Sequence, residues 1–443
     1  MGLATFKGGI HPYDGKDISK ERPVKTILPK DELVFLMSQH IGAPATPTVK
    51  PGDKVLMGQI IGEASAFISA NVISSVSGTV KAIEPRLAVS GDMVNAVIIE
   101  NDHEYTPVEG FGTKRDYRRL TKQQIREIIK GAGIVGMGGA GFPTHVKMTP
   151  KDDDAISHVI INGAECEPYL TSDYRMMMEE PGRIIDGLKV ILSLFTRAKG
   201  IIAIEDNKPD AIKKIEELVK NEPNIQVCPL KTKYPQGGER ALIYAVTKKK
   251  VNSSMLPADV GCVVSNIDTT VAISMAVSDS IPLMRRIVTV TGDAIKEPCN
   301  YNVKIGMSYR EVLEEAGGLA KPVEKIVSGG PMMGVTVPNL QVPVLKQTNA
   351  IIAFNKKEVK MPKTTACIRC GACIKNCPFG INVPAVVKGY KTGDMEMVEK
   401  AGLGFCMECG CCSFGCPANR PLVQTNKLAK RALKEYKAKE GNK

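Results

Sequence analysis

The fold is decided by Cys367-Ile-Arg-Cys-Gly-Ala-Cys-Ile-Lys-Asn-Cys-Pro378, which repeats 39 residues later as Cys406-Met-Glu-Cys-Gly-Cys-Cys-Ser-Phe-Gly-Cys-Pro417. Both runs follow C-x-x-C-x-x-C-x-x-x-C-P. In this pattern three cysteines bind one [4Fe–4S] cube and the fourth ligates the other cube. The predicted ligands are Cys367, Cys370, Cys373 and Cys416 for cluster 1, and Cys406, Cys409, Cys412 and Cys377 for cluster 2.

Structural zinc is the alternative for these cysteines, because zinc sites also use Cys-x-x-Cys pairs. Zinc needs two such pairs per ion, and it needs neither a third cysteine in register nor the Cys-Pro ending. Cys411 is a ninth cysteine in this stretch, out of register with the repeat, and is predicted not to be a ligand. The two runs therefore predict two cubane clusters and one-electron transfer.

The composition is that of a soluble protein with more than one domain: 443 residues, 43% hydrophobic and 24% charged. Thirteen cysteines, nine of them in the metal-type stretch, favour a reducing compartment over a disulfide framework. No secretory signal is visible at the N-terminus, and no stretch approaches the roughly 18 apolar residues of a membrane span.

The net charge of +12 has three possible explanations: an acidic partner, an anionic membrane surface, or solubility alone. Nucleic acid is disfavoured as a partner, because the few aromatic residues are not interleaved with a basic stripe.

Residues 1–110 are predicted to form an all-β domain. Between residues 40 and 100, short apolar alternations such as Gly58-Gln-Ile-Ile-Gly-Glu are separated by turn signals. This pattern resembles the barrel-sandwich domains that carry biotin or lipoate on a lysine at the tip of a hairpin. The corresponding segment here, Ala64-Ser-Ala-Phe-Ile-Ser-Ala70, contains no lysine, so swinging-arm chemistry is not expected.

Residues 111–280 are predicted to form an α/β domain with a mostly parallel sheet. A capping box at Thr121 and Gln124 begins a helix, and predicted strands then alternate with predicted helices. The strands are placed at 158–161, 200–205 and 225–230, and the helices at 174–194, 210–220 and 239–247. Residues 281–355 predict a small β-grasp module with a helix capped by Ser308. Residues 356–443 hold the clusters in an α-helical, ferredoxin-like domain with a basic tail.

Three segments of the α/β domain are candidate cofactor contacts. Gly136-Met-Gly-Gly-Ala-Gly141 matches G-x-G-x-x-G, but a helix precedes it and Phe142-Pro143 follows where a helix should open, unlike the dinucleotide fingerprint. Asn162–Pro168 follows the first strand, and Tyr234–Arg240 is a glycine turn that opens a helix. On the glycines alone, a plain loop remains as good an explanation as a ligand site; the three segments together favour a nucleotide-type cofactor.

These segments, with Ser265–Thr269, resemble the flavin- and NADH-binding segments of the NADH-oxidising subunit of respiratory complex I. With the sandwich, the β-grasp module and the two-cluster tail, the whole chain resembles the RnfC family of the Rnf (Rsx) complexes, ion-translocating ferredoxin:NAD⁺ oxidoreductases. The resemblance implies non-covalent FMN, NAD(H) as substrate and two [4Fe–4S] clusters. It also implies a peripheral subunit on the cytoplasmic face of the bacterial cell membrane, attached through partner membrane and iron–sulfur subunits.

Carried over by position, the resemblance gives Glu167 a catalytic role at the NAD(H) site. The implied cofactor contacts are Gly136, Gly138, Gly139, Phe142, Lys147, Asn162, Glu165, Gly237, Gly238, Glu239 and Asn266. Two positions depart from the pattern: Met137 stands where complex I has an arginine, and Ala164 stands where it has an acidic residue. The flavin is therefore expected to sit somewhat differently.

Two other functions are compatible with these motifs. A soluble flavin and iron–sulfur reductase of cobalamin resembles the same family, but its sandwich domain is expected at the other end of the chain. A non-catalytic electron wire with a decayed flavin site is the second, against which the intact Gly138, Lys147, Asn162 and Glu167 argue. In the favoured function a flavin converts the two-electron chemistry of NAD(H) into the one-electron steps of the clusters.

Overall fold

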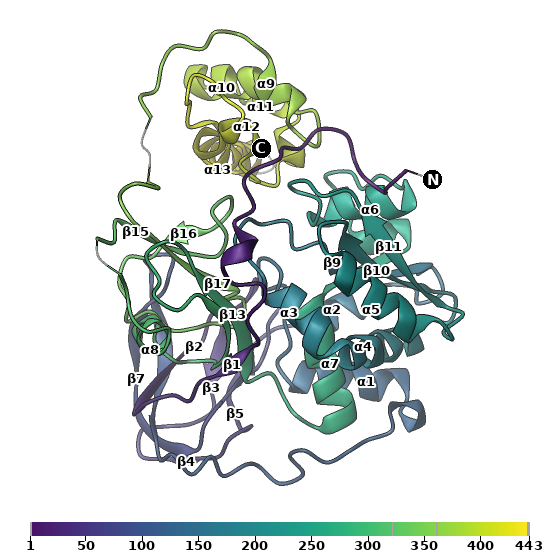
Figure 1. Ribbon diagram of the computed structural model, residues 1–443, viewed down its shortest axis with the longest axis vertical. Helices are drawn as coiled ribbons and strands as arrows, with labels where there is room; N and C mark the ends of the chain where they lie inside the picture. Colours follow the sequence, from purple (N-terminus) through teal and green to yellow (C-terminus); the bar gives the residue numbers. More distant parts are fainter. Residues whose placement is uncertain (1, 321, 360–361, 441–443) are drawn as a thin grey trace.

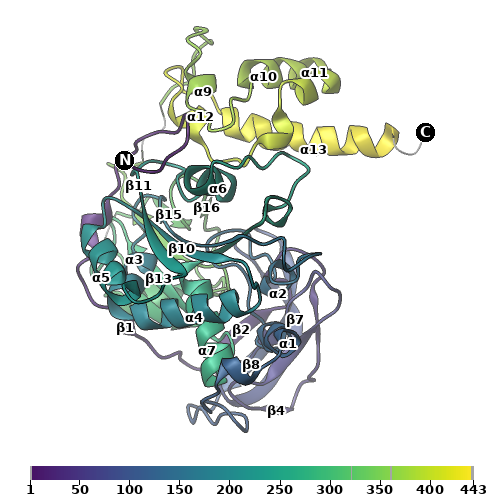
Figure 2. The ribbon, with the colours of Figure 1, turned by 90° about the vertical axis from the view of Figure 1, so that its right-hand side faces the viewer.

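The computed structural model describes residues 2–320, 322–359 and 362–440. Two β-rich parts and one α/β part make up the body of the molecule, and a small helical domain that contains all the cluster cysteines lies above them (Figure 1). A view from the side shows that the long C-terminal helix α13 crosses the top of the body (Figure 2).

The predicted barrel-sandwich is confirmed as two antiparallel sheets, ordered β2-β8-β7-β4 and β3-β5-β6. Their strands are β2 (Glu32–Leu36), β3 (Ala45–Pro47), β4 (Lys54–Val55), β5 (Ile60–Ala64), β6 (Val72–Ile73), β7 (Gly78–Leu87) and β8 (Met93–Asn101). Alternation places Leu33 and Phe35 in the core, as period-two patterning requires. The bend between β5 and β6 carries no lysine. Instead, the ring of Phe67 packs edge-on against His145 in the α/β part.

The α/β part has a four-stranded, fully parallel sheet in the order β11-β10-β9-β12, as predicted. Its strands are β9 (His158–Gly163), β10 (Lys199–Glu205), β11 (Ile225–Leu230) and β12 (Cys262–Asn266). Around it lie α1 (Lys122–Gly131), α2 (Thr144–Lys147), α3 (Ser172–Glu179), α4 (Pro181–Ser193), α5 (Pro209–Val219), α6 (Glu239–Thr247) and α7 (Ile267–Asp279), with the 3₁₀ turns η2 (Tyr117–Arg119) and η3 (Pro257–Val260).

One predicted helix of this part is wrong. The helix expected over 174–194 is two helices, because Pro181 lacks the N–H that a continuous helix needs and instead occupies the first turn of α4. The capping box at Thr121 is present as predicted and begins α1.

The predicted β-grasp module contributes to a six-stranded sheet ordered β1-β14-β13-β17-β15-β16. Its strands are β1 (Lys25–Thr26), β13 (Arg285–Thr291), β14 (Cys299–Lys304), β15 (Lys325–Ser328), β16 (Val335–Thr336) and β17 (Ala350–Phe354). The helix α8 (Tyr309–Glu315) begins with the capping box predicted at Ser308.

Residues 2–27 form an extended segment, the N-terminal arm, that lies outside the barrel-sandwich. Ala4 bridges to Leu230 at the sheet of the α/β part, and β1 pairs in parallel with β14. The 3₁₀ turn η1 (Lys16–Ile18) lies between these contacts. In Figure 1 the arm runs from beside α6, beneath the helical domain, down to β1. The arm thus joins three parts of the molecule.

The helical domain is formed by short helices around the cysteine loops and by one long helix. Its elements are α9 (Ala372–Lys375), α10 (Val383–Thr392), α11 (Met395–Lys400), η4 (Leu403–Phe405), α12 (Cys411–Phe414) and α13 (Leu422–Glu440). Within the described ranges of the chain, no helix has the length and apolar character needed to cross a membrane.

Candidate cofactor sites

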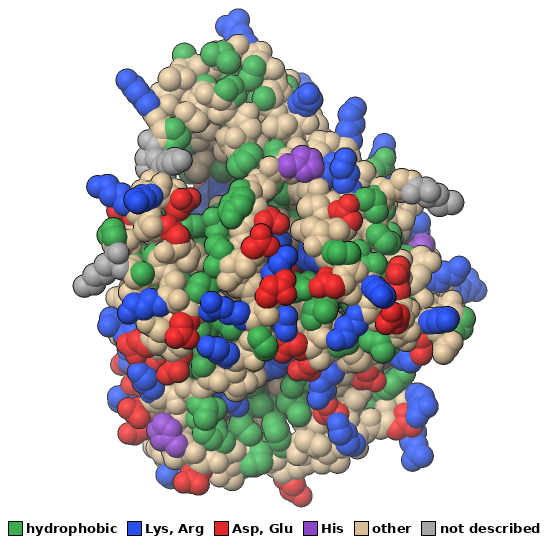
Figure 3. Space-filling model, viewed as in Figure 1, with side chains coloured by type: hydrophobic (Ala, Val, Ile, Leu, Met, Phe, Trp, Pro, Cys, Tyr) green, Lys and Arg blue, Asp and Glu red, His purple; other side chains and the backbone are tan. Residues whose placement is uncertain are grey.

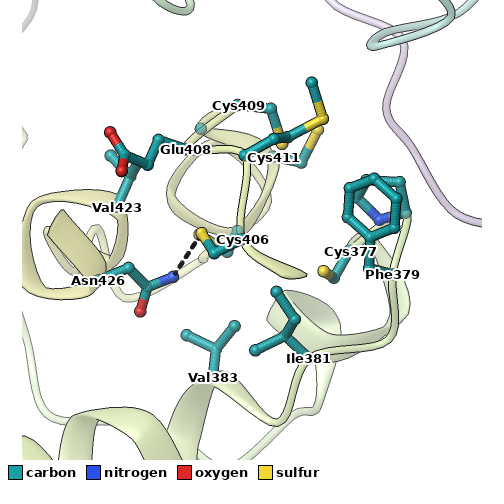
Figure 4. Close-up of a pocket in the computed structure, with 14 residues that line it drawn as sticks. Cys377, Phe379, Ile381, Val383, Cys406, Glu408, Cys409, Cys411, Val423 and Asn426 are labelled. Atoms are coloured by element: carbon teal, nitrogen blue, oxygen red, sulfur yellow. Dashed lines mark hydrogen bonds between the residues drawn. The ribbon is translucent and has the colours of Figure 1, made fainter. Parts of the chain in front are cut away.

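The four cysteines predicted for cluster 2 line one pocket. Cys377 comes from the first run and Cys406, Cys409 and Cys412 come from the second. In Figure 4 the Cys377 sulfur points toward Cys406, and the Cys406 sulfur points toward Asn426, whose amide donates a hydrogen bond to it over 3.7 Å. The rest of the wall is mostly apolar and includes Phe379, Ile381, Val383 and Val423. Four sulfurs around a largely apolar hollow are the donor set that a cubane cluster requires.

The cluster 1 cysteines lie nearer the surface. Cys367 and Cys370 are exposed, while Cys373 and Cys416 are partly buried. Cys373 and Cys416 belong to the same packed cluster, and helices α9 and α12 of the two runs are in contact. A backbone hydrogen bond joins the neighbouring segments, since the Thr365 N–H donates to the Ala418 carbonyl over 3.0 Å. Burial raises the pKa of the Cys373 thiol, and the nearby Cys416 and Cys367 raise it further.

Across the residues described, no three His, Cys, Asp or Glu side chains are arranged to hold a single metal ion. A cube differs in this respect, because it spreads its four thiolates over four separate irons.

Cys411 lines the same pocket as the cluster 2 cysteines but faces another neighbour. Its side chain is fully buried, and its sulfur lies 3.8 Å from the Tyr234 carbonyl oxygen. The thiol therefore packs against the turn that precedes α6, and the prediction that it is not a ligand remains open to experiment.

The glycine loop closes on itself between α1 and α2. The Gly136 N–H donates to the Phe142 carbonyl over 2.8 Å, so Gly138 and Gly139 are left at an exposed tip. A Cβ at residue 138 would lie 3.1 Å from the Asn266 side chain, so the loop backbone approaches this strand end closely. The expectation that no helix opens after Phe142-Pro143 is wrong, because the single turn α2 begins there at Thr144.

Two asparagines stand at the carboxyl ends of neighbouring strands. Asn162 on β9 and Asn266 on β12 are paired in register. The Asn162 amide donates to the Gly237 carbonyl over 2.8 Å, and the Asn266 amide donates to Asp173 over 2.7 Å. The parallel sheet thus brings the glycine loop, both asparagines and the Gly237 turn to one edge, where such sheets bind ligands.

Lys147 and Glu239 are joined to each other at this edge. The Lys147 ammonium lies 2.8 Å from a Glu239 carboxylate oxygen, and both side chains are partly exposed. Lys147 also donates to the Val264 carbonyl over 3.4 Å. A phosphate that used Lys147 would therefore share the ammonium with Glu239 or displace it.

The turn after β9 is held by two buried lysines. From the arm, Lys16 donates to the backbone carbonyls of Glu165, Glu167 and Leu170 over 2.9, 3.0 and 2.5 Å. Lys208 donates to the Ala164 carbonyl over 2.8 Å. This turn needs support because Glu165 adopts a left-handed backbone conformation, with φ of 47°. The buried Glu165 carboxylate accepts from the Asp173 N–H over 2.7 Å.

Glu167 lies beneath a loop of the β-grasp module. Its carboxylate accepts from the Met332 N–H over 3.2 Å and from the Tyr234 hydroxyl over 3.3 Å. A side chain at Gly330 would overlap the carboxylate, so only glycine fits there. Burial raises the pKa of Glu167 to about 7. The structure therefore places Glu167 between three parts of the chain.

Arg286 is a site residue that the sequence did not reveal. It enters from β13, is 2% exposed, and pairs with buried Asp268 on α7. Its guanidinium also contacts Met137, the glycine-loop residue that departs from the complex I pattern. An arginine within an alternating strand has no local signal that distinguishes it from a surface residue, so only the three-dimensional packing shows its position.

The Gly237 turn also touches the loop of cluster 2. Gly238 packs against Met407, which lies between Cys406 and Cys409, two of the ligands predicted for cluster 2. Met332, the residue that binds Glu167, packs against Gly410 of the same loop. The two candidate sites are therefore in direct van der Waals contact.

Comparison with known proteins agrees with this arrangement. Family models match residues 4–104 (RnfC barrel sandwich hybrid domain), 129–275 (Nuo51 FMN-binding domain), 287–336 (SLBB domain) and 360–417 (4Fe-4S dicluster domain). The chain is 42% identical to the C subunit of the proton-translocating ferredoxin:NAD(+) oxidoreductase complex of Clostridium ljungdahlii, over 90% of this chain and 88% of that protein.

The Na(+)-translocating counterpart of Acetobacterium woodii is 41% identical over 97% of both chains. The C subunit of the ion-translocating oxidoreductase complex of Rhodobacter capsulatus is 39% identical over 98% of this chain and 84% of that protein. This chain belongs to the RnfC family. As an RnfC protein it is an oxidoreductase subunit with an FMN-binding domain and a domain for two [4Fe–4S] clusters.

The residues of the two candidate sites fit FMN and [4Fe–4S] clusters. At the FMN-binding domain of this RnfC chain, the glycine loop leaves an open backbone surface beside Asn266, and Asn162 and Lys147 add polar groups at the same edge. At the dicluster domain, the cluster 2 cysteines converge on one pocket.

Proposed function

We propose that this RnfC protein exchanges electrons with NAD(H) at the glycine-loop edge and conducts them through cluster 2 to cluster 1, in either direction. FMN, when bound, exchanges a hydride with the nicotinamide and passes electrons on singly. The observation that supports this function most directly is the contact of Gly238 with Met407, because it puts the proposed flavin edge against the cluster 2 loop.

The chain's own residues would hold and orient the reactants. Gly136, Gly138 and Gly139 offer a backbone surface without side chains, and Asn162 and Asn266 direct amides to the same edge. Lys147 supplies the positive charge for a phosphate. Glu165 and Glu167 stand on the turn that Lys16 fixes, and Glu167 binds Met332, which packs against Gly410 of the cluster 2 loop.

Phe142 and Glu239 complete the proposed nicotinamide side of the site. The partly buried Phe142 follows the open tip of the glycine loop, and Glu239 opens α6 next to Gly238. Glu167 is proposed to act on bound NAD(H), and the covering loop with Met332 would then move aside when the substrate enters.

The protein is proposed to sit on the cytoplasmic face of the bacterial cell membrane, attached to membrane and iron–sulfur subunits of an ion-translocating ferredoxin:NAD⁺ oxidoreductase complex. The relatives' assignment to such complexes supports this placement.

One titration tests the proposal. Anaerobic protein with FMN and iron in place is mixed with NADH, and the bleaching of flavin and clusters is followed optically. We expect Glu167→Gln to keep FMN and iron but to lose NADH-driven bleaching, while dithionite still reduces it fully. The exposed Glu217→Gln on α5 serves as the matched control. Wild-type protein that retains no FMN after gentle purification and never bleaches with NADH would favour the electron-wire function instead.

A further inference from the structure

The chain's positive charge is concentrated in the dicluster domain. Residues 356–443 contain 17 Lys and Arg against seven Asp and Glu, which gives +10 of the chain's +12. Two cubes in their 2+ state, each held by four thiolates, add about −4 and leave this domain at about +6. The body of the molecule is nearly neutral, so a charge-selected partner would meet the dicluster domain.

Within the domain, the two segments that contain basic residues and no acidic ones carry the cysteines predicted for cluster 1. The segments 362–380 and 410–421 contain no Asp or Glu, but contain Lys363, Arg369, Lys375 and Arg420. In the described structure none of these four forms an ion pair, whereas Lys430 pairs with Glu408 and Lys437 with Glu399 elsewhere in the domain. Figure 2 shows the acidic helix α11 with α10, away from α9 and α12.

Large apolar side chains are exposed among these charges. Ile368, next to the ligand Cys367, is 66% exposed, and Phe414, two residues before the ligand Cys416, is 54% exposed. The Arg420 guanidinium donates to the Thr365 carbonyl over 3.3 Å, which ties the two segments into one surface. In the space-filling view the helical domain shows basic and hydrophobic side chains, and the acidic side chains gather on the body below (Figure 3).

We propose that the cluster 1 face, formed by Ile368, Arg369, Lys375, Phe414 and Arg420, is the docking site of an acidic redox protein or protein domain. This rests on the proposed electron transfer through the clusters. The unpaired cations steer an acidic partner and orient it, and the apolar pair excludes water at the contact. One electron then passes between the partner's centre and cluster 1, so that one is oxidised as the other is reduced.

Stopped-flow mixing tests the face with a small acidic [2Fe–2S] ferredoxin as the probe, because its absorption spectrum differs from that of a [4Fe–4S] cluster. Dithionite-reduced ferredoxin, freed of excess dithionite, is mixed with oxidised protein that contains iron and no NAD(H), and cluster bleaching is followed. We expect Arg369→Glu/Lys375→Glu to lower the second-order rate constant about tenfold at low salt, and high salt to remove this difference. The wild-type rate itself should fall as salt rises.

The matched control is Lys388→Glu/Lys391→Glu on α10, which makes the same change in net charge away from the cluster 1 face. We expect it to stay within about twofold of wild type, and reduction by methyl viologen radical to be equal in all three proteins. Equal rates for the face variant and wild type, or equal losses in both variants, would overturn the proposal.

Membranes are the competing occupant of a basic face. Salt-sensitive capture of wild type by phosphatidylglycerol vesicles, lost in Arg369→Glu/Lys375→Glu and without the expected change in ferredoxin rate, would assign this face to lipid and overturn the proposal. Because the rate is measured without NAD(H), it is independent of the NADH titration, and either proposal can fail alone.

Discussion

Met407 packs so tightly against Gly238 that a Cβ at residue 238 would lie 2.7 Å from its terminal methyl carbon. The same Cβ would lie 3.2 Å from the Pro235 carbonyl oxygen, which is backbone and cannot yield easily. The contact joins the α6 turn to the loop that carries Cys406 and Cys409. Its closeness is therefore a structural condition for electron transfer between the two proposed sites.

Gly238→Ala is expected to separate the two sites by forcing Met407 away. Since the backbone at residue 238 is in an ordinary extended conformation, the variant should fold and keep its iron. Flavin bleaching by NADH should persist, and cluster bleaching should slow, in anaerobic stopped-flow traces. Gly182→Ala in α4 is the control, because a Cβ there meets nothing within 4 Å. Unaltered cluster bleaching in Gly238→Ala would remove the Met407 contact from the route.

Cys411→Ala is expected to leave the iron content near that of wild type. The Cys411 sulfur faces the Tyr234 carbonyl, and its loss costs packing of about 1 kcal/mol or somewhat more. Cys409→Ala should instead disrupt one cube and remove about half of roughly eight irons. Iron and acid-labile sulfide assays decide the matter: a halved count in Cys411→Ala would show that our ligand set is wrong.

Lys16→Met is expected to loosen the turn of Glu165 and Glu167. The change keeps the apolar stem but leaves three carbonyls without their donor, at a cost of about 2–4 kcal/mol in the free energy of unfolding. Amide hydrogen exchange should rise in residues 164–170, and NADH should reduce the flavin with a higher KM. Lys20→Met tests specificity, because Lys20 forms ion pairs with Asp17 and Glu21 and touches no part of the turn in those contacts.

Lys346 gives the fold a measurable pH dependence. It is 1% exposed and donates to the carbonyls of Asn71 and Gly133, and burial lowers its pKa to about 7. The unfolded chain binds the proton up to the ordinary lysine pKa of 10.5, so between pH 7 and about 10 folding releases a proton and this residue's contribution to stability rises with pH.

Lys346→Met should lack that rise. The free energy of unfolding of the wild type, relative to that of Lys346→Met, is therefore expected to increase by about 2 kcal/mol from pH 7 to pH 9, within the limit of about 1.4 kcal/mol per pH unit. Denaturant unfolding of both proteins measures the difference, and subtraction removes titrations that they share, such as that of Glu167. A constant difference across this range would show that Lys346 is charged in the folded protein.

The sequence predicted the elements and the cofactor classes well, because those rest on local patterns. The α6 helix has the predicted bounds Glu239–Thr247, and the capping boxes at Thr121 and Ser308 open helices. The cysteine spacing predicted a two-cluster domain, which the dicluster family model confirms. Pro181 could have predicted the break between α3 and α4, because proline cannot continue a helix from the preceding turn.

The contacts that build the site were not predictable in this way. Lys16 and Glu165 are separated by 149 residues, and Met332 and Glu167 by 165. No local sequence pattern indicates either pair. From the sequence alone a lysine is expected at the surface, and a methionine in a loop has no expected partner. The same holds for Arg286, whose guanidinium lies under the glycine loop although its strand belongs to another module.

The N-terminal arm imposes an order on the making of this molecule. The Gly9 N–H donates to the Asn376 carbonyl over 2.9 Å, and the neighbouring Gly8 lies against the carbonyl of Cys377, a predicted ligand of cluster 2. The arm is synthesised before Asn376 and Cys377, so this contact can form only after the first cysteine run has been made. The cysteines predicted for cluster 2 are made at the same late stage, so iron insertion and the closure of the arm over this loop both follow the synthesis of Cys412.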